Sequence, residues 1–176
     1  MVKLVPYDKN RHRTQFFDLN VELITWISEK MRVYHNIDSV SIMGQTVREY
    51  VETVFENFTA IKPPKGILYI LEIHDEVAGM GALKHLEDGV GEIKRMYIRP
   101  KYRGQGFGKA MLQKLIQKAK TFGYATLRLE TGDYSTTAHH IYRSAGFKEI
   151  DEYPDVETPE WYRPYCLFME KNLCDE

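Results

Sequence analysis

A run of glycines between basic residues is the stretch of this chain whose residue types most clearly suggest chemistry. Gly104, Gly106 and Gly108 alternate along it, with Arg103 before them and Lys109 after them. Without a Cβ atom, glycine lets the backbone turn tightly and lets a ligand approach the main chain. If a helix begins here, its free N–H groups and partial positive charge favour an anion. The stretch therefore predicts a phosphate-binding loop.

Such a loop must be held by a strand before it and a helix after it. Tyr97 and Ile98 suit a strand, and Pro100 marks its end because proline cannot donate to a sheet ladder. From Gly108 apolar residues recur every three or four positions, which predicts a helix to about Phe122. Gly123 suits the left-handed position that ends a helix.

Two common phosphate-binding motifs do not fit the loop. The Walker A motif needs a glycine where Arg103 stands, and a serine or threonine where Ala110 stands. The dinucleotide fingerprint needs a third glycine, and Lys109 occupies its position. A glycine turn before an ordinary surface helix remains the structural alternative.

The remaining elements alternate between helix and strand patterns. The sequence predicts a first strand at 2–5, helices at about 9–31 and 47–58 joined by a link at 36–44, and a three-strand meander over 67–73, 77–83 and 91–98. After the glycine loop and its helix we expect a strand at 124–130, a short helix from Thr136 or Thr137 to Arg143, and strands at 147–150 and 165–169. The strand–helix–strand crossing implies one parallel pair in the sheet. Gly79 and Gly81 within a strand pattern predict close backbone approach or a bulge.

Composition excludes several classes of protein. The 176 residues suit one domain, taken here as 1–176, and the net charge of −1 gives no basic excess for nucleic acid. No apolar run approaches the ~20 residues that span a bilayer, and the N-terminus does not match a signal peptide. Cys166 and Cys174 lack metal-ligand spacing, so we expect reduced thiols in a cytoplasmic protein.

Two motifs far apart in the chain resemble the GNAT superfamily, the acetyl-coenzyme A-dependent N-acetyltransferases. They are Arg-x-x-Gly-x-Gly, ending at Gly108, and Ala-x-x-x-Tyr-x-x-x-Gly-Phe, ending at Phe147. The expected element order, βααβββαβαββ, is also that family's order from end to end. The resemblance implies an α/β (α+β) fold of one GNAT domain, with a mixed, mostly antiparallel sheet of about seven strands flanked by about four helices.

The resemblance also implies acetyl-coenzyme A as cosubstrate, with no metal. In that family the glycine loop binds the pyrophosphate, and the preceding strand end offers its backbone to the pantetheine arm. An N–H near Ile98 would also hydrogen-bond the thioester oxygen. Ser135 stands where many relatives carry asparagine; its hydroxyl can still donate one hydrogen bond to the pantetheine, but it lacks the separate donor and acceptor atoms of an amide. The cofactor-binding residues expected in this way are Met96, Tyr97, Ile98, Arg103, Gly104, Gln105, Gly106, Phe107, Gly108, Lys109 and Ser135.

Acetyl transfer to an amine needs a base and benefits from an acid. An alkylamine with a pKa near ~10 is mostly protonated at pH 7 and must lose a proton before it attacks. Glu92 stands on the central strand where several relatives carry a glutamate base; the alternative is a hairpin-edge residue paired with Lys94 or Arg95. Tyr142 matches the tyrosine that protonates the departing thiolate in many relatives; the alternative is a packing aromatic.

His139 and His140 are adjacent, so on a helix they point about 100° apart and do not converge on one metal ion; we expect surface histidines. The segment before the last strand combines aromatic and acidic residues, and in the family it borders the acceptor site. Its carboxylates would attract a cationic amine, although a solvated acidic loop is an equal alternative. These residues are Asp151, Glu152, Tyr153, Asp155, Glu157, Glu160, Trp161 and Tyr162.

The sequence thus favours an N-acetyltransferase that acts on a primary amine of a small molecule or peptide by direct attack in a ternary complex. The acceptor, the acyl length and the oligomeric state stay open, although a homodimer is a tendency of the family. Two other functions remain open: a non-catalytic module that binds acetyl-coenzyme A, and a nucleotide-binding protein. No nucleic acid or membrane partner is expected.

Overall fold

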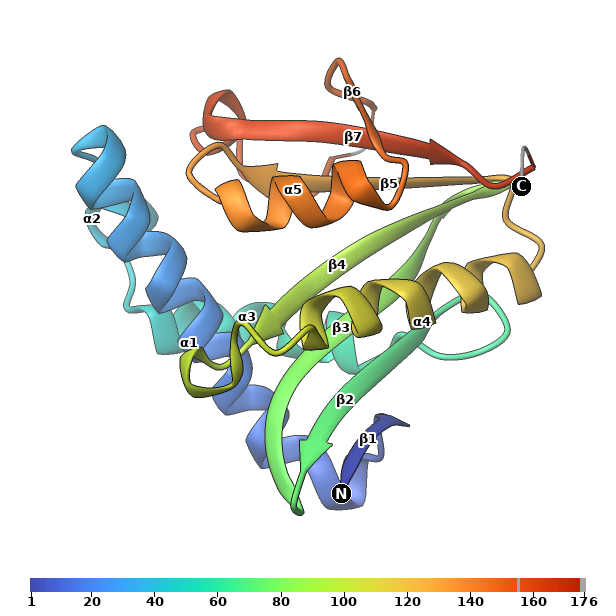
Figure 1. Ribbon diagram of the computed structural model, residues 1–176. Coiled ribbons are helices and arrows are strands. Elements are labelled where there is room, and N and C mark those ends of the chain that lie inside the picture. Colours follow the sequence, from blue (N-terminus) through green and yellow to red (C-terminus); the bar gives the residue numbers. More distant parts are fainter. Residues whose placement is uncertain (155, 175–176) are drawn as a thin grey trace.

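The fold is built on one mixed sheet of seven strands, with helices on both faces (Figure 1). The computed structural model describes residues 1–154 and 156–174. The strands lie in the order β1-β2-β3-β4-β5-β7-β6, and each neighbouring pair is antiparallel except β4 with β5. Their bounds are β1 Val2–Pro6, β2 Ile67–Ile73, β3 Glu76–Glu87, β4 Val90–Ile98, β5 Thr126–Gly132, β6 Lys148–Ile150 and β7 Cys166–Asn172.

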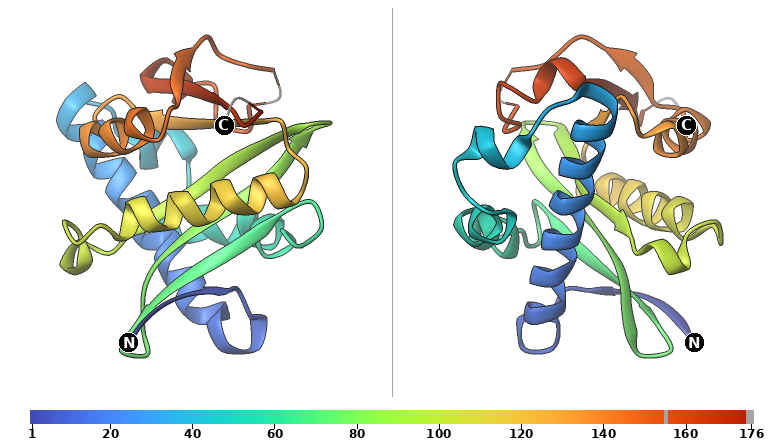
Figure 2. Two further views of the ribbon diagram at one scale, coloured as in Figure 1. Left: turned by 45° about the vertical axis from the view of Figure 1, so that its right-hand side comes forward. Right: turned by 90° about the vertical axis from the view of Figure 1, so that its left-hand side faces the viewer.

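The helices divide between the two faces of the sheet, as the two views of Figure 2 make clear. One face carries α1 (Lys9–His35), α2 (Ser39–Met43) and α3 (Val47–Thr59), and the other carries α4 (Phe107–Thr121) and α5 (Thr136–Ser144). We call these the α1/α3 face and the α4/α5 face. The expected fold class, the strand count and the single parallel pair are confirmed.

The link expected at 36–44 is partly helical, which corrects the expectation of about four helices to five in the described residues. Asp38 caps α2 by accepting from the N–H groups of Val40 and Ser41, and Gly44 ends it with a φ of 64°. A short polar capping residue and a terminal glycine are the usual ends of a helix. The sequence does not predict this helix, because five residues are too few to show a helical period.

Several other boundaries also differ from those expected. The first long helix continues one turn beyond Met31, to His35, and stops where Asn36 takes a left-handed φ of 55°. The strand expected at 124–130 lies at Thr126–Gly132, because Tyr124 and Ala125 belong to the turn that leaves α4. The left-handed φ at the end of the first helix suits Asn36, because asparagine tolerates this conformation better than most residues do.

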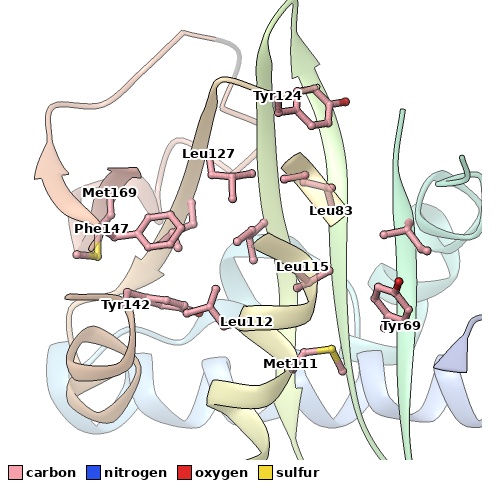
Figure 3. Packing of buried hydrophobic residues seen from close by; sticks show 14 of the residues in the cluster. Tyr69, Leu83, Met111, Leu112, Leu115, Tyr124, Leu127, Tyr142, Phe147 and Met169 are labelled. Carbon is pink, nitrogen blue, oxygen red and sulfur yellow. The ribbon is translucent and has the colours of Figure 1, made fainter. Parts of the chain in front are cut away.

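Each face of the sheet has its own apolar core. On the α4/α5 face Leu112 and Leu115 of α4 pack with Leu127 and Leu129 of β5 (Figure 3). On the α1/α3 face Phe16 and Leu19 of α1 are completely buried with Val51 and Phe55 of α3. These two cores hold β4 at the centre of the sheet, where the candidate site lies.

The central strands β3 and β4 approach closely at Gly79. A Cβ atom added there would lie 2.5 Å from the backbone oxygen of Tyr97, so only glycine fits without moving one of the two strands. The pairing also shifts register between Met80 and Ala82, which is the irregularity expected from the two glycines. Within residues 1–154 and 156–174, every helix is too short or too polar to cross a bilayer.

Candidate active site

The sheet opens between its two parallel strands. The pairing of β4 with β5 covers only Val90–Ile93 against Thr126–Leu129, although both strands continue beyond it. Figure 1 shows the two strands separating from there toward the N-termini of α4 and α5. Residues 94–98 of β4 therefore present a backbone edge that no strand of the described chain covers on the β5 side. This is the strand end that the sequence predicts for an extended ligand.

The glycine loop places the uncapped N-terminus of α4 beside this opening. Gly106 is the N-cap of α4 with a φ of 83°, and no side chain caps the helix. Gly104 also has a left-handed φ, of 76°, and a Cβ at either glycine would have nothing within 4 Å. The first N–H groups of α4 therefore lack both intrahelical and side-chain acceptors. Such a helix end is built to receive an anion.

The residues around these amides differ in what they do. Gln105 and Lys109 are exposed, whereas Phe107 packs its ring against the α4/α5 core. The Arg103 side chain turns back to the strand: its Nε donates to the Ile98 carbonyl at 2.8 Å, and its guanidinium lies over the rings of Trp26 and Tyr97. The loop and strand end thus meet as predicted, and the exposed Arg103 side chain forms part of the contact between them.

Tyr142 lies on α5, on the α4/α5 face. Its ring is 6% exposed, packs edge-on against Phe147 and lies beside Leu112 of α4 (Figure 3). Burial raises the pKa of Tyr142 to about 12, and no charged or hydrogen-bonding group in the described residues contributes to the shift. The phenol is therefore protonated at neutral pH and has a proton to donate.

Glu92 lies on β4 and faces the opposite side of the sheet. It is 1% exposed, and its Oε1 accepts a 2.7 Å hydrogen bond from the Tyr153 hydroxyl. Lys94 Nζ lies 3.3 Å from the same oxygen. Its Oε2 is buried and has no hydrogen-bond partner in the described residues. The alternative for Glu92 is a hairpin-edge residue paired with Lys94 or Arg95. The contact with Lys94 agrees with that alternative, but the location of Glu92 does not, because β4 is a central strand of the sheet.

Lys94 joins Glu92 to a second carboxylate, Glu130, whose side chain is 17% exposed. Its Nζ lies 3.2 Å from Glu130 Oε1, and that oxygen also accepts from the Thr158 hydroxyl. Burial lowers the pKa of Lys94, but the carboxylates of Glu130 and Glu92 outweigh it, so the net pKa is raised. We call these three side chains, Glu92, Lys94 and Glu130, the buried charge triad. Glu130 was not among the predicted site residues, although charges alternate with period two at 92/94 and 128/130 on strands expected to pair.

The start of α5 lies at the same opening. Ser135 is the N-cap of α5 but makes no capping bond, so neither Thr136 nor Thr137 caps the helix as expected. His139 is buried and bonds the Gly132 carbonyl at 2.9 Å, which corrects the expectation of a surface histidine. A buried imidazole needs such a partner. In the described residues, no cluster of His, Cys, Asp or Glu side chains is arranged to hold a metal ion.

The acidic segment before β7 is only partly free. Glu157 pairs with Lys84, and Glu152 pairs with Arg163, so two of its carboxylates are already neutralised. Asp155 lies outside the described residues. Tyr153 is buried against Phe168, and Tyr162 bonds the hydroxyl of Tyr134 at 2.7 Å. The segment thus covers the α1/α3 side of the charge triad, and two of its carboxylates are paired rather than free to attract a cationic amine.

The parted parallel pair, the glycine loop and the uncapped helix beside it could together receive a phosphorylated ligand with an extended tail, and such an arrangement belongs to a class of proteins that can be tested by comparison. The family comparison names that class: residues 24–147 match the acetyltransferase (GNAT) family. The chain therefore belongs to the GNAT acetyltransferase family, as its motifs indicate.

Curated relatives share the central part of the chain. IAA acetyltransferase of Azospirillum brasilense is 38% identical over 98 residues, which are 55% of this chain and 61% of that protein. An uncharacterised N-acetyltransferase of Bacillus subtilis, YsnE, is 38% identical over 101 residues, 56% of this chain and 64% of that protein. Human N-acetylaspartate synthetase is 28% identical over 113 residues, 60% of this chain and 37% of that protein. The match thus spans about 60% of the length of the first two relatives.

Solved structures match the whole fold. A Klebsiella pneumoniae protein provisionally described as an acyl-CoA N-acyltransferase has a TM-score of 0.71 and 26% identity, with 98% of each chain covered. The PaiA N-acetyltransferase of Thermoplasma acidophilum, solved in complex with coenzyme A, has a TM-score of 0.68 and 16% identity, with 98% of this chain and 99% of that chain covered. The second likeness concerns the fold alone.

Proposed function

We propose that this protein is an acetyl-coenzyme A-dependent N-acetyltransferase that acetylates a primary amine by direct attack in a ternary complex. The observation that carries the proposal is the uncapped, glycine-led N-terminus of α4 beside the unpaired edge of β4. Membership of the GNAT acetyltransferase family supports it. The relatives' names specify different acceptors, so they do not define the acceptor of this chain.

The residues at the opening fit the coenzyme. Main-chain N–H groups from 104–109 would hold its pyrophosphate, and the edge at Met96–Ile98, which no described strand covers on the β5 side, would hydrogen-bond the pantetheine amides. An N–H at this edge would also polarise the thioester carbonyl. When bound, the coenzyme supplies an activated acetyl group. Holding that group and the amine together contributes much of the rate.

Glu92 is the proposed acceptor of the amine's proton. Tyr153 and Lys94 both contact its Oε1, which leaves Oε2 without a partner in the described residues and able to accept a proton. Because the side chain is 1% exposed, we propose that the proton reaches it through a single water or the Tyr153 hydroxyl. As the amine nitrogen bonds to the acetyl carbon, the carbon–sulfur bond breaks, and Tyr142 on the other face donates its proton to the sulfur.

Acetyl-coenzyme A is expected to raise the thermal unfolding midpoint of the protein more than ATP does, because it binds only the folded state. A thiol-release assay with a broad panel of amines then tests for turnover. Stabilisation with no thiol above the blank rate for any amine would indicate a non-catalytic binding module. Stabilisation by ATP alone would indicate a nucleotide-binding protein. Absence of any shift with acetyl-coenzyme A would end the proposal.

Replacing Glu92 with glutamine is expected to lower kcat at pH 7 by roughly 10²-fold or more, since a general base contributes about that much. The loss should shrink toward pH 10, where a primary amine with a pKa of ~10 is largely neutral without help. The pH profile of kcat is the measurement.

Glu130→Gln is the matched control, because it also removes one carboxylate from Lys94. If both variants lose the same activity with the same pH profile, the effect is electrostatic imbalance around Lys94 and Glu92 is not the base.

A further inference from the structure

Arg95 occupies an irregular position in the middle of β4. Met80 pairs with Tyr97 and Ala82 pairs with Lys94, so Arg95 and Met96 together face the single residue Gly81. This is a β-bulge, and Arg95 adopts a φ of 56° within it. A non-glycine residue with a left-handed φ is uncommon and often marks a functional position.

The bulge changes which face the side chains occupy. In a regular strand Lys94 and Arg95 would point to opposite faces. Here Lys94 joins the buried charge triad, while the Arg95 guanidinium lies over the ring of Phe58 in α3, 3.8 Å from its centroid. Met96 Sδ instead lies beside Gly81 on the side of Met111, in α4. The bulge thus brings Arg95 onto the α1/α3 side of the sheet, where Glu92 and Lys94 also lie.

Arg95 is half-buried and has no ion-pair partner in residues 1–154 and 156–174, because each nearby carboxylate pairs with a lysine instead. Glu92 and Glu130 share Lys94, and Glu157 pairs with Lys84. Burial lowers the pKa of Arg95, although Tyr50 of α3, Glu130 and Glu157 act in the opposite direction, Tyr50 partly through a side-chain hydrogen bond that uses one side of the guanidinium. The positive charge is therefore only partly compensated by its surroundings.

The way in which the guanidinium is held leaves it able to bind an anion. Its flat face is stacked on Phe58, and stacking does not use the N–H groups at its edge. Those donors form a planar fork that matches a carboxylate in a bidentate pair. On the same side of the sheet, Glu92 Oε2 and Glu130 Oε2 are buried acceptors without a partner in the described residues. Within that part of the chain, this side of the sheet thus offers a cation without an ion pair and two unpaired acceptors.

We propose that the acceptor is an amine that also carries a carboxylate, as an amino acid does, and that the Arg95 guanidinium binds this carboxylate. The inference rests on the proposed function, in which Glu92 receives the proton of the same molecule's amine. The backbone of the bulge fixes the position of Arg95, so its guanidinium is already oriented before the substrate binds. No atom of Arg95 takes part in the bond changes.

The test compares L-amino acids with their carboxamides as acceptors in the thiol-release assay. The two have the same side chain and differ only in the charged group. We expect kcat/KM to be roughly 10- to 100-fold higher for the acid, since a charge-assisted bidentate contact is lost in the amide. The amide's amine is the less basic of the two, so more of it is neutral, and intrinsic reactivity would favour the opposite order.

Arg95→Asn is the informative variant, because asparagine tolerates the left-handed backbone of the bulge. It should bring the acid-to-amide ratio close to one by lowering kcat/KM for the acid alone, and Arg95→Lys should give an intermediate ratio. Arg48→Asn is the matched control: Arg48 also stacks on a phenylalanine, Phe17, but lies on α3 away from β4. It should leave the ratio unchanged.

Equal turnover of acids and amides by the unaltered protein would overturn the inference but leave the acetyltransferase proposal intact. Turnover of other amines but of no amino acid would do the same, as would an Arg95→Asn variant that loses both activities equally. If Arg95→Asn fails to fold, Arg95→Lys supplies the ratio. If no amine at all is acetylated, the proposed function itself fails, and the inference fails with it.

Discussion

Tyr142→Phe is expected to lower kcat by about 10²- to 10⁴-fold, the usual contribution of a positioned general acid, while the affinity for acetyl-coenzyme A stays unchanged. The buried ring of Tyr142 packs edge-on against the ring of Phe147. Phenylalanine has the same ring and therefore fills the same space. Because the hydroxyl has no described partner that its removal would strand, the variant should be at least as stable as the unaltered protein. Kinetics and thermal unfolding measured together test both statements.

The pKa of about 12 adds a second expectation for Tyr142. A phenol with this pKa keeps its proton across assays from about pH 6 to pH 10, so any decline of the rate at alkaline pH must come from another group.

Tyr124→Phe is the matched control, because its hydroxyl bonds the Lys65 carbonyl at 2.6 Å, away from the opening. It should lose stability and keep activity, the reverse of Tyr142→Phe. An active Tyr142→Phe variant would show that Tyr142 is a packing residue.

Lys94→Met is expected to destabilise the protein by about 3–5 kcal/mol, because it leaves two largely buried carboxylates without their shared cation. The Lys94 side chain is 9% exposed and lies within 3.3 Å of Glu92 and Glu130. For a chain of this size the loss corresponds to a fall of about 6–20 °C in the unfolding midpoint. Adding Glu92→Gln and Glu130→Gln should recover much of the loss, since no stranded charge would remain.

The pH dependence of this difference follows from the raised pKa of Lys94. A cation whose pKa is raised by folding contributes stability below its unfolded pKa, about 10.4, and this contribution is lost as the pH rises through the folded pKa. The gap between the unaltered protein and Lys94→Met should therefore be constant near neutral pH and shrink above about pH 10.4.

Lys84→Met is the control for this prediction. Its partner Glu157 is half exposed, and such a pair contributes about 1 kcal/mol or less. An equal effect of the two lysine substitutions would mean that the triad is no more than a surface pair.

Much of the fold could be read from local patterns. The apolar run at Ile67–Ile73 and the spacing of Leu112, Leu115 and Ala119 predict their strand and helix correctly, because burial of one face imposes a period on the chain. Helix α2 escaped because it has only five residues. His139 escaped because its burial depends on a carbonyl supplied by β5, seven residues earlier in the chain.

The candidate site divides along the same line. The glycine loop and Tyr142 could be predicted as site residues from sequence, because their residue types and spacing are local features. Glu130 and Arg95 were missed as site residues. Their significance depends on which charge each one meets, or fails to meet, across strands and helices.

The sequence by itself determines that a strand, a glycine turn and a helix follow one another. It therefore also determines that uncapped main-chain N–H groups lie at the start of α4. Residue order alone does not set where β4 and β5 part, which carboxylates share Lys94, or that Arg95 faces Glu92's side of the sheet. Those features were decided by tertiary structure, because a bulge opposite Gly81 reorients a side chain only when β3 is in register beside it.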